Sequence, residues 1–235
     1  MNLIILFKED FIEKDIVRIE GRRFEHVLSV HKAEVGQTLK VGLLNGKIGT
    51  GYITNMENKM LQMKVNLTDE PPKPLQSQLI LAMPRPKVFA RILQTATALG
   101  IKKIFVIKTW RVQKSYWNSP VLSEESLSKN MILGLEQTKD TILPEVRVVK
   151  LFKPFVEDQI SSIIEGTIAL VAHPIADAMC PYDIKKPTTI AIGPEGGFIE
   201  YEIDMLKKHG FTVVGFGNRI LKVETAVPYI YGKLY

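Results

Sequence analysis

The chain has 235 residues, of which 46% are hydrophobic and 24% charged, a composition typical of globular rather than disordered proteins. A formal net charge of +6 and an isoelectric point of about 9.2 indicate a polyanionic partner, nucleic acid first, although a merely basic soluble surface would give the same values. The single cysteine, Cys180, excludes an internal disulfide, and no apolar run reaches transmembrane length, so we expect a cytoplasmic protein that engages no membrane.

The first part of the chain carries several short runs that alternate between apolar and polar residues. Strands are expected at 16–19, 37–41, 47–54 and 60–67, with an Asn45-Gly46 turn between the second and third. So many short strands in a small region predict a little β-barrel over residues 1–70. The proline-rich stretch 69–74 is expected to be a linker, and a second domain should occupy 75–235.

Beyond the linker, strand and helix patterns alternate. Strands are predicted at 78–83, 101–107, 145–150, 167–172, 188–192 and 211–216, and helices at 86–99, 123–139, 154–166 and 199–209, with a further helix opened by 224–226. Strictly alternating elements of this kind build a mostly parallel sheet with helices on both faces.

The last third of the chain repeats one pattern, an apolar strand followed by a glycine-bearing turn and a helix. The first turn reads Gly-Pro-Glu-Gly-Gly-Phe at 193–198, and the second spans 217–226. Both lie where their strands end, the edge at which open α/β sheets bind ligands, and glycine lets a ligand approach the bare main chain. Each turn also holds an acidic residue, Glu195 or Glu224. We interpret the pair as a small-molecule site, joined by the loop after Ala172; the alternative is plain connections, with Glu224 capping a helix.

Several other kinds of site lack their sequence signals. No Gly-Lys-Ser/Thr follows the glycines and no G-x-G-x-x-G occurs, which argues against Walker-type nucleotide sites and nicotinamide sites. The four histidines, His26, His31, His173 and His209, have no spacing typical of metal ligands, so no metal site is expected. His173, beside Pro174, is expected to shape its loop.

Basic residues mark candidate RNA contacts. The segment 108–117 interleaves Arg111 and Lys114 with aromatic side chains, a pattern suited to unpaired bases and phosphates, although a loop packed by its own aromatics is an equal alternative. Arg85 and Lys87 form a second group, for which a solvated face is the alternative. The predicted RNA-binding set also includes Arg22, Arg23 and Lys32 of the first domain.

The motifs at 193–198 and 221–226 (Leu-Lys-Val-Glu-Thr-Ala) resemble those of the SPOUT superfamily. More narrowly, the chain resembles the RsmE-type 16S ribosomal RNA uridine-N3 methyltransferases. Weaker likeness extends over 83–87, 94–100, Gln137 and 144–146, and the region around Asn45 is similar to the PUA-like domain of that family.

The resemblance implies a SPOUT-like, mostly parallel sheet with a trefoil knot, a PUA-like β-barrel that binds RNA, a homodimer, and S-adenosylmethionine as methyl donor. It implies N3-methylation of a uridine in 16S ribosomal RNA of the small subunit, with Arg219, Glu195 and Arg111 as candidate catalytic residues. The implied cofactor-binding residues are Ala172, His173, Gly193, Glu195, Gly196, Gly197, Phe216, Gly217, Ile220, Leu221, Val223, Glu224, Thr225 and Ala226.

The chain also departs from the family pattern. Thr95 and Ala98 replace a usual Lys and Glu, Trp110 stands where an acidic residue is common, and Asp140 lies near a usual Arg. These departures leave the target nucleotide open. The alternatives are a SPOUT methyltransferase with another RNA target and a non-catalytic RNA-binding protein on the same fold.

Overall fold

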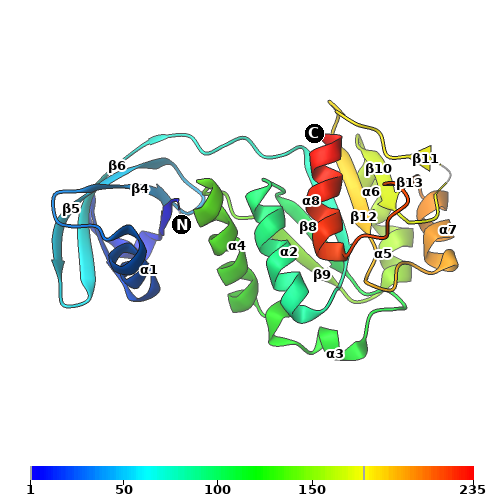
Figure 1. Ribbon diagram of the computed structural model, residues 1–235, viewed down its shortest axis with the longest axis horizontal. Coiled ribbons are helices and arrows are strands. Elements are labelled where there is room, and N and C mark those ends of the chain that lie inside the picture. Colours follow the sequence, from blue (N-terminus) through cyan, green and yellow to red (C-terminus); the bar gives the residue numbers. More distant parts are fainter. Residues whose placement is uncertain (1, 177) are drawn as a thin grey trace. The chain divides into compact units, whose positions relative to one another are not determined.

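The computed structural model describes residues 2–176 and 178–235, and it divides into two compact units. The first comprises the chain up to Lys73 together with Ile132–Leu143, and the second comprises Pro74–Met131 and Pro144–Tyr235 (Figure 1). The short segment Ile132–Leu143 therefore returns to the first unit after the chain has begun to build the second.

The first unit is built around a six-stranded mixed sheet. Its strands are β1 (Ile4–Leu6), β2 (Phe11–Glu13), β3 (Ile16–Glu20), β4 (Thr38–Leu43), β5 (Ile48–Glu57) and β6 (Met60–Asp69). The order is β1-β4-β5-β6-β3-β2; β1 and β4 are parallel and the other neighbours antiparallel. The 3₁₀ turn η1 (Lys8–Asp10), the helix α1 (Gly21–His26) and the π-helical turn η2 (Val27–His31) complete the unit.

Period-two patterning explains why these segments pair as strands. Val17 and Ile19 on β3 are fully buried, as are Ile53 on β5 and Leu61 and Met63 on β6, while their neighbours along the strands face outward. These side chains belong to one hydrophobic core that also includes Ile4, Leu6, Phe24, Val27, Ala33, Val41 and Val65. A second, smaller cluster of buried residues comprises Leu3, Ile5 and Ile48 together with Leu135 of the returning segment.

The second unit is a seven-stranded, all-parallel sheet. Its strands are β7 (Ser77–Ala82), β8 (Lys103–Ile107), β9 (Glu145–Val149), β10 (Ile168–Ala172), β11 (Ala178–Met179), β12 (Thr188–Ile192) and β13 (Thr212–Gly215), in the order β11-β13-β10-β12-β7-β8-β9. The central strand β12 is buried along its whole length, as expected for a parallel strand covered on both faces. The expected α/β class and parallel sheet are confirmed, and the knot stays a prediction.

Helices connect these strands and cover the sheet. They are α2 (Pro86–Ala98), α3 (Lys114–Trp117), η3 (Pro120–Leu122), α4 (Glu124–Thr138), α5 (Phe152–Asp158), α6 (Ile160–Ile164), α7 (Glu200–Lys208) and α8 (Val223–Leu234). The single helix expected at 154–166 is instead two short helices, because Gln159 leaves the helical region at φ −123° and ψ −30°. In Figure 1, α2 and α8 lie side by side, and α8 continues through Pro228.

Among residues 2–176 and 178–235, no helix is both long and apolar enough to cross a membrane.

Candidate functional site

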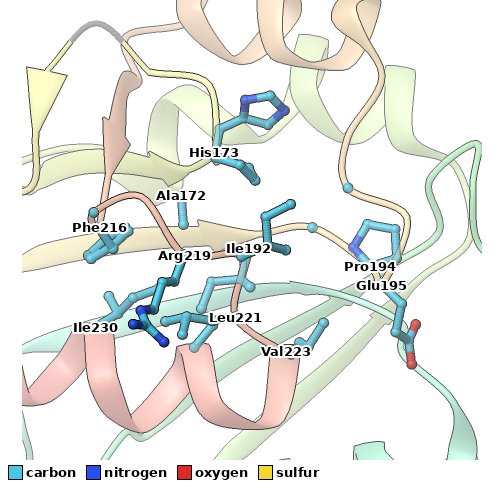
Figure 2. A pocket seen from close by; sticks show the side chains of 16 residues that line it. Ala172, His173, Ile192, Pro194, Glu195, Phe216, Arg219, Leu221, Val223 and Ile230 are labelled. Atoms are coloured by element: carbon cyan, nitrogen blue, oxygen red, sulfur yellow. The ribbon is translucent and has the colours of Figure 1, made fainter.

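The loops that follow β10, β12 and β13 meet at one edge of the parallel sheet and enclose a cavity. Its volume is about 120 Å³, or about 680 Å³ when the space of its open mouth is included. Ala172 ends β10, Ile192 ends β12, and Phe216 directly follows β13, so each loop enters the cavity from the carboxyl end of its strand (Figure 2). Because β10 lies between β12 and β13, the three loop entrances are neighbours.

Three glycines contribute main chain to the wall of the cavity. Gly193, Gly197 and Gly217 all line it. Gly197 has φ +72° and Gly217 has φ +109°, values that side chains disfavour. Gly193 is needed for a different reason, because a Cβ atom there would lie 3.0 Å from the Phe198 nitrogen and 3.2 Å from the Phe198 ring. The glycines therefore contribute main chain to the cavity wall from the loops after β12 and β13.

Apolar side chains make up most of the remaining wall. They come from the end of β12, from the loop between β13 and α8, and from α8 itself, and they are Ile192, Phe216, Ile220, Leu221, Val223 and Ile230. Val223, Ala226 and Ile230 are spaced by three and four residues, which places them on one side of the helix. Such walls suit the faces of a flat, largely apolar ring.

Polar side chains reach the cavity at only a few points, and two of them turn away from it. The His173 Nδ1 atom lies 2.9 Å from the Ile175 carbonyl oxygen, so this ring folds back on its own loop. Glu195 accepts a hydrogen bond of 2.9 Å from the Arg85 backbone nitrogen, at the start of α2. Figure 2 shows the Glu195 carboxylate directed away from the cavity, whereas Arg219 lies among the lining residues.

Most predicted cofactor-binding residues line this cavity; the other three are Gly196, Glu224 and Thr225. The Gly196 carbonyl accepts a hydrogen bond from the Arg111 guanidinium, which holds Arg111 against the back of the loop. Glu224 pairs with Arg91 on α2 at 2.9 Å. The Thr225 backbone nitrogen donates to the Lys222 carbonyl as α8 begins.

Four lining residues were absent from the prediction: Pro174, Ile192, Pro194 and Ile230. Pro174 and Pro194 stand within the predicted loops. Ile192 is the last residue of a predicted strand. Ile230 follows Ala226 by one helical turn, so helical spacing was a usable signal for it.

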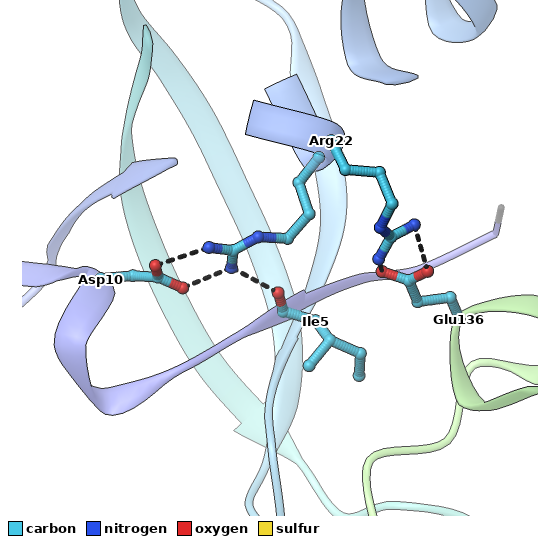
Figure 3. Close-up of polar contacts among 5 residues, drawn as sticks. Ile5, Asp10, Arg22 and Glu136 are labelled. Carbon is cyan, nitrogen blue, oxygen red and sulfur yellow. Dashed lines mark hydrogen bonds and ion pairs between the residues drawn. The ribbon is translucent and has the colours of Figure 1, made fainter. Parts of the chain in front are cut away.

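Some of the predicted RNA-binding side chains are exposed, whereas others form ion pairs within the protein. Arg85, Lys87, Arg111 and Lys114 are exposed in the second unit, and Lys32 is exposed in the first. Arg23 is instead held inside the first unit, where its guanidinium contacts both Asp10 oxygens and the Ile5 carbonyl. Arg22 pairs with both oxygens of Glu136 at 2.9 and 3.0 Å (Figure 3). The charges of Arg22 and Arg23 are thus already engaged in ion pairs within the first unit.

Two titratable groups of the second unit have strongly shifted pKa values. Burial raises the pKa of the Cys180 thiol to about 11, although nearby Lys233 opposes the shift. Burial also raises the pKa of Tyr231 well above its usual range, and the Tyr231 hydroxyl donates to the Gln78 carbonyl at 3.2 Å. Both shifts therefore follow from burial. Within the described ranges, no three His, Cys, Asp or Glu residues gather as a metal site would require.

Comparison with known protein families identifies the family of this chain. The family model described as the RNA methyltransferase domain matches residues 71–234, which include the whole cavity. The chain belongs to this RNA methyltransferase family. The family resemblance inferred from the two glycine-bearing motifs is thereby confirmed, and the methyltransferase domain spans the entire parallel sheet.

Relatives of this methyltransferase match it over nearly its full length. "Ribosomal RNA small subunit methyltransferase E 1" of Borreliella burgdorferi is 26% identical over 96% of this chain and 94% of its own. "Ribosomal RNA small subunit methyltransferase E" of Treponema pallidum is 29% identical over 96% of this chain and 87% of its own. The narrower resemblance to the RsmE type agrees with these names.

Solved structures show the same fold. A methyltransferase of Legionella pneumophila, determined with bound S-adenosylmethionine, superposes with a TM-score of 0.76 at 22% identity, covering 99% of this chain and 96% of its own. A ribosomal RNA small subunit methyltransferase E of Neisseria gonorrhoeae, also bound to S-adenosylmethionine, gives a TM-score of 0.73 at 20% identity, over 98% and 96% of the two chains. Both units of the methyltransferase are thus covered by the likeness.

Proposed function

We propose that this protein transfers a methyl group from S-adenosylmethionine to N3 of a uridine in 16S ribosomal RNA of the small subunit. The observation that carries the proposal is the cavity at the carboxyl ends of β10, β12 and β13, walled by glycine main chain and apolar side chains, in a chain of the RNA methyltransferase family. The relatives from Borreliella and Treponema are named for small-subunit ribosomal RNA, which supports the choice of substrate.

The residues of the cavity fit the proposed cofactor. Ile192, Leu221 and Ile230 offer apolar surfaces to the faces of an adenine ring, and the main chain at Gly193 and Gly217 offers hydrogen-bonding groups at its edge. The absence of a Cβ atom on Gly193 lets this loop pack closely on Phe198, since a side chain there would collide with Phe198. The related structures from Legionella and Neisseria contain this cofactor.

The reaction requires the protein mainly to align the methyl donor with uridine N3 and to stabilise the charge that develops on the base. S-adenosylmethionine supplies a methyl group already activated by a positive sulfur. Uridine N3 must lose a proton, for which solvent water is the acceptor, as the new bond forms, so a cation beside the base stabilises the negative charge that develops on the ring. Arg219 lines the cavity, and Arg111 is fixed against the adjacent loop through the Gly196 carbonyl. We assign charge stabilisation to Arg219 first and to Arg111 second.

Glu195 fits a positioning role better than an acid-base role. Its carboxylate accepts from the Arg85 nitrogen at 2.9 Å and points away from the cavity (Figure 2). It ties the glycine-bearing loop to the N-terminus of α2, where a negative charge is favourable. Glu195 thereby holds the loop in place while Arg219 faces the reacting base.

The exposed charges of the second unit support the proposed RNA substrate. Arg85, Lys87, Arg111 and Lys114 supply exposed positive charge on the same unit as the cavity, as binding to a phosphate backbone requires. Lys32 adds positive charge on the first unit. We propose a homodimer as the working assembly, following the RsmE-type resemblance.

The test is transfer of tritium-labelled methyl to purified small ribosomal subunits, with the modified nucleotide mapped by mass spectrometry. Label at N3 of one uridine in 16S RNA is the expected result. Label in another RNA, or at another base, would point to a different target, and RNA binding without label would point to a non-catalytic protein. Arg219→Ala should lower kcat at saturating RNA; an unchanged rate would remove Arg219 from the mechanism.

A further inference from the structure

Trp110 is the unusual residue of the loop that follows β8. Its side chain is 81% exposed, although tryptophan is a large side chain that proteins mostly bury. Thr109 before it and Val112 two residues after it are buried, at 4% and 6% exposed, while Arg111 is exposed like Trp110. The loop is therefore packed into the second unit while its indole ring stands in solvent.

The main chain of Trp110 is fixed by a buried carboxylate. The Trp110 backbone nitrogen donates a 2.7 Å hydrogen bond to Glu202 Oε1, and Glu202 is only 3% exposed. The other Glu202 oxygen accepts a 3.0 Å bond from the Ile199 nitrogen at the start of α7. Both oxygens of one buried group are thus used to join the β8 loop to a helix terminus.

The residue after Trp110 fixes the loop to the wall of the cavity. The Arg111 guanidinium donates to the Gly196 carbonyl, and Gly196 lies between lining residues Glu195 and Gly197. The exposed ring therefore projects from a segment held on one side by Glu202 and on the other by the rim of the cofactor cavity. Because the Trp110 backbone is already fixed, only the side-chain torsions lose freedom when the ring contacts a ligand.

We propose that Trp110 is a stacking platform for an unpaired RNA base next to the target nucleotide, and that Glu202 is the residue that positions it. This inference rests on the proposed function and deepens it. A methyltransferase acting on the pairing edge of uridine needs its target base unpaired, and the loops and ends that supply such a base also carry neighbours that can stack on an aromatic side chain. An indole face beside the Arg111 cation offers such a base both stacking and charge, in a way that tolerates any base identity.

The experiment uses tryptophan fluorescence, because the chain has two tryptophans, Trp110 and Trp117. In a Trp117→Phe protein, Trp110 is the sole reporter, and binding of a single-stranded uridine-rich RNA should quench its emission. Trp110→Ala should raise the KM for RNA about 10- to 100-fold, while kcat and the cofactor Kd from calorimetry stay within about twofold. Trp110→Phe should recover most of the loss.

Glu202→Gln tests the positioning role, since the amide keeps the shape but turns one acceptor into a donor. We expect a raised KM for RNA with kcat and cofactor affinity unchanged, and a weaker quench in the Trp117→Phe background. Tyr201→Ala is the matched control, because Tyr201 is a 53% exposed aromatic residue on the same helix and should leave the KM for RNA within about twofold.

Each outcome separates this inference from the proposed function. A wild-type protein that methylates RNA, with Trp110→Ala leaving KM unchanged or with no quench of Trp110, overturns the inference alone. A wild-type protein that methylates no RNA overturns the proposed function, while the quench still reports stacking. If Trp110→Ala instead changes the oligomeric state in sedimentation, the ring belongs to an interface between copies and the inference is wrong.

Discussion

Replacing Gly193 by alanine is the most direct perturbation of the cavity wall. Gly193 is buried, lines the cavity and does not have a positive φ, so alanine is allowed by the backbone itself. The added methyl group would nevertheless meet three atoms at close range. They are the Phe198 nitrogen at 3.0 Å, the Phe198 Cδ2 atom at 3.2 Å and the Gly197 carbonyl carbon at 3.3 Å.

The free-energy cost of the added methyl group depends on whether these three atoms can move away from it. Two of them are backbone, and the Phe198 ring is only 3% exposed, so none can swing away as the end of a flexible side chain would. Overpacking of this kind costs about 1–3 kcal/mol. Because the cavity lies on the open side, the loop 193–197 should move toward it, and the cofactor Kd should rise about 5- to 150-fold.

Calorimetric titration with S-adenosylmethionine measures the effect, and Gly196→Ala is the matched control in the same loop. A Cβ atom on Gly196 would lie 3.1 Å from Arg111 Cδ, so it would press on the Arg111 side chain and not on the cavity, which Gly196 does not line. Gly196→Ala should therefore bind the cofactor nearly as well as the unmodified protein. A folded Gly193→Ala protein with unchanged cofactor affinity would refute the claim that this loop forms the cofactor wall.

Three further predictions concern the framework around the site. Asp10→Asn should lower the free energy of unfolding by about 3 kcal/mol in urea titrations, because it leaves the Arg23 guanidinium without its buried partner; a change below about 0.5 kcal/mol would contradict the structural role of this pair. Cys180 should react with thiol reagents at pH 8 about 100-fold more slowly than an ordinary cysteine, since burial raises its pKa from 9.0 to about 11; rapid modification of the folded protein would contradict this. Burial, helped by neighbouring His31 and Arg22, lowers the pKa of His26 from 6.5, so the unfolded chain takes up a proton first and stability should fall as pH drops through 6.5. His26→Gln should flatten melting temperatures between pH 7.5 and 5.5, and an unchanged slope would exclude His26 as the cause.

The parallel sheet was predictable because its strands are short, β-branched and apolar on both faces. β12, for example, reads Thr-Thr-Ile-Ala-Ile and is buried throughout, so period and composition alone indicate a central strand. The return of Ile132–Leu143 to the first unit had no such signal. The helical pattern of α4 shows which side chains are apolar, but it does not show which core receives Leu135.

The candidate site was predictable for a related reason. Glycine at a strand end constrains the main chain directly, and Gly193, Gly197 and Gly217 indeed meet at one cavity. The direction of a charged side chain depends instead on partners far away in sequence. Glu195 turns to Arg85, 110 residues away, and Arg23 turns inward to Asp10, and no local pattern reveals either contact.

The departures from the family pattern fall outside the wall of the cavity, and this separation has a mechanistic consequence. Asp140 is 4% exposed and its Oδ1 atom accepts from the Ile142 nitrogen at 2.9 Å, so it shapes a turn of the first unit. Trp110 stands in solvent at the rim. The wall itself depends on main chain and apolar bulk, which tolerate little change, whereas a projecting ring can be exchanged without disturbing the fold. Cofactor binding and RNA affinity therefore rest on different classes of residue, and substitutions at Trp110 should change the KM for RNA while cofactor affinity stays constant.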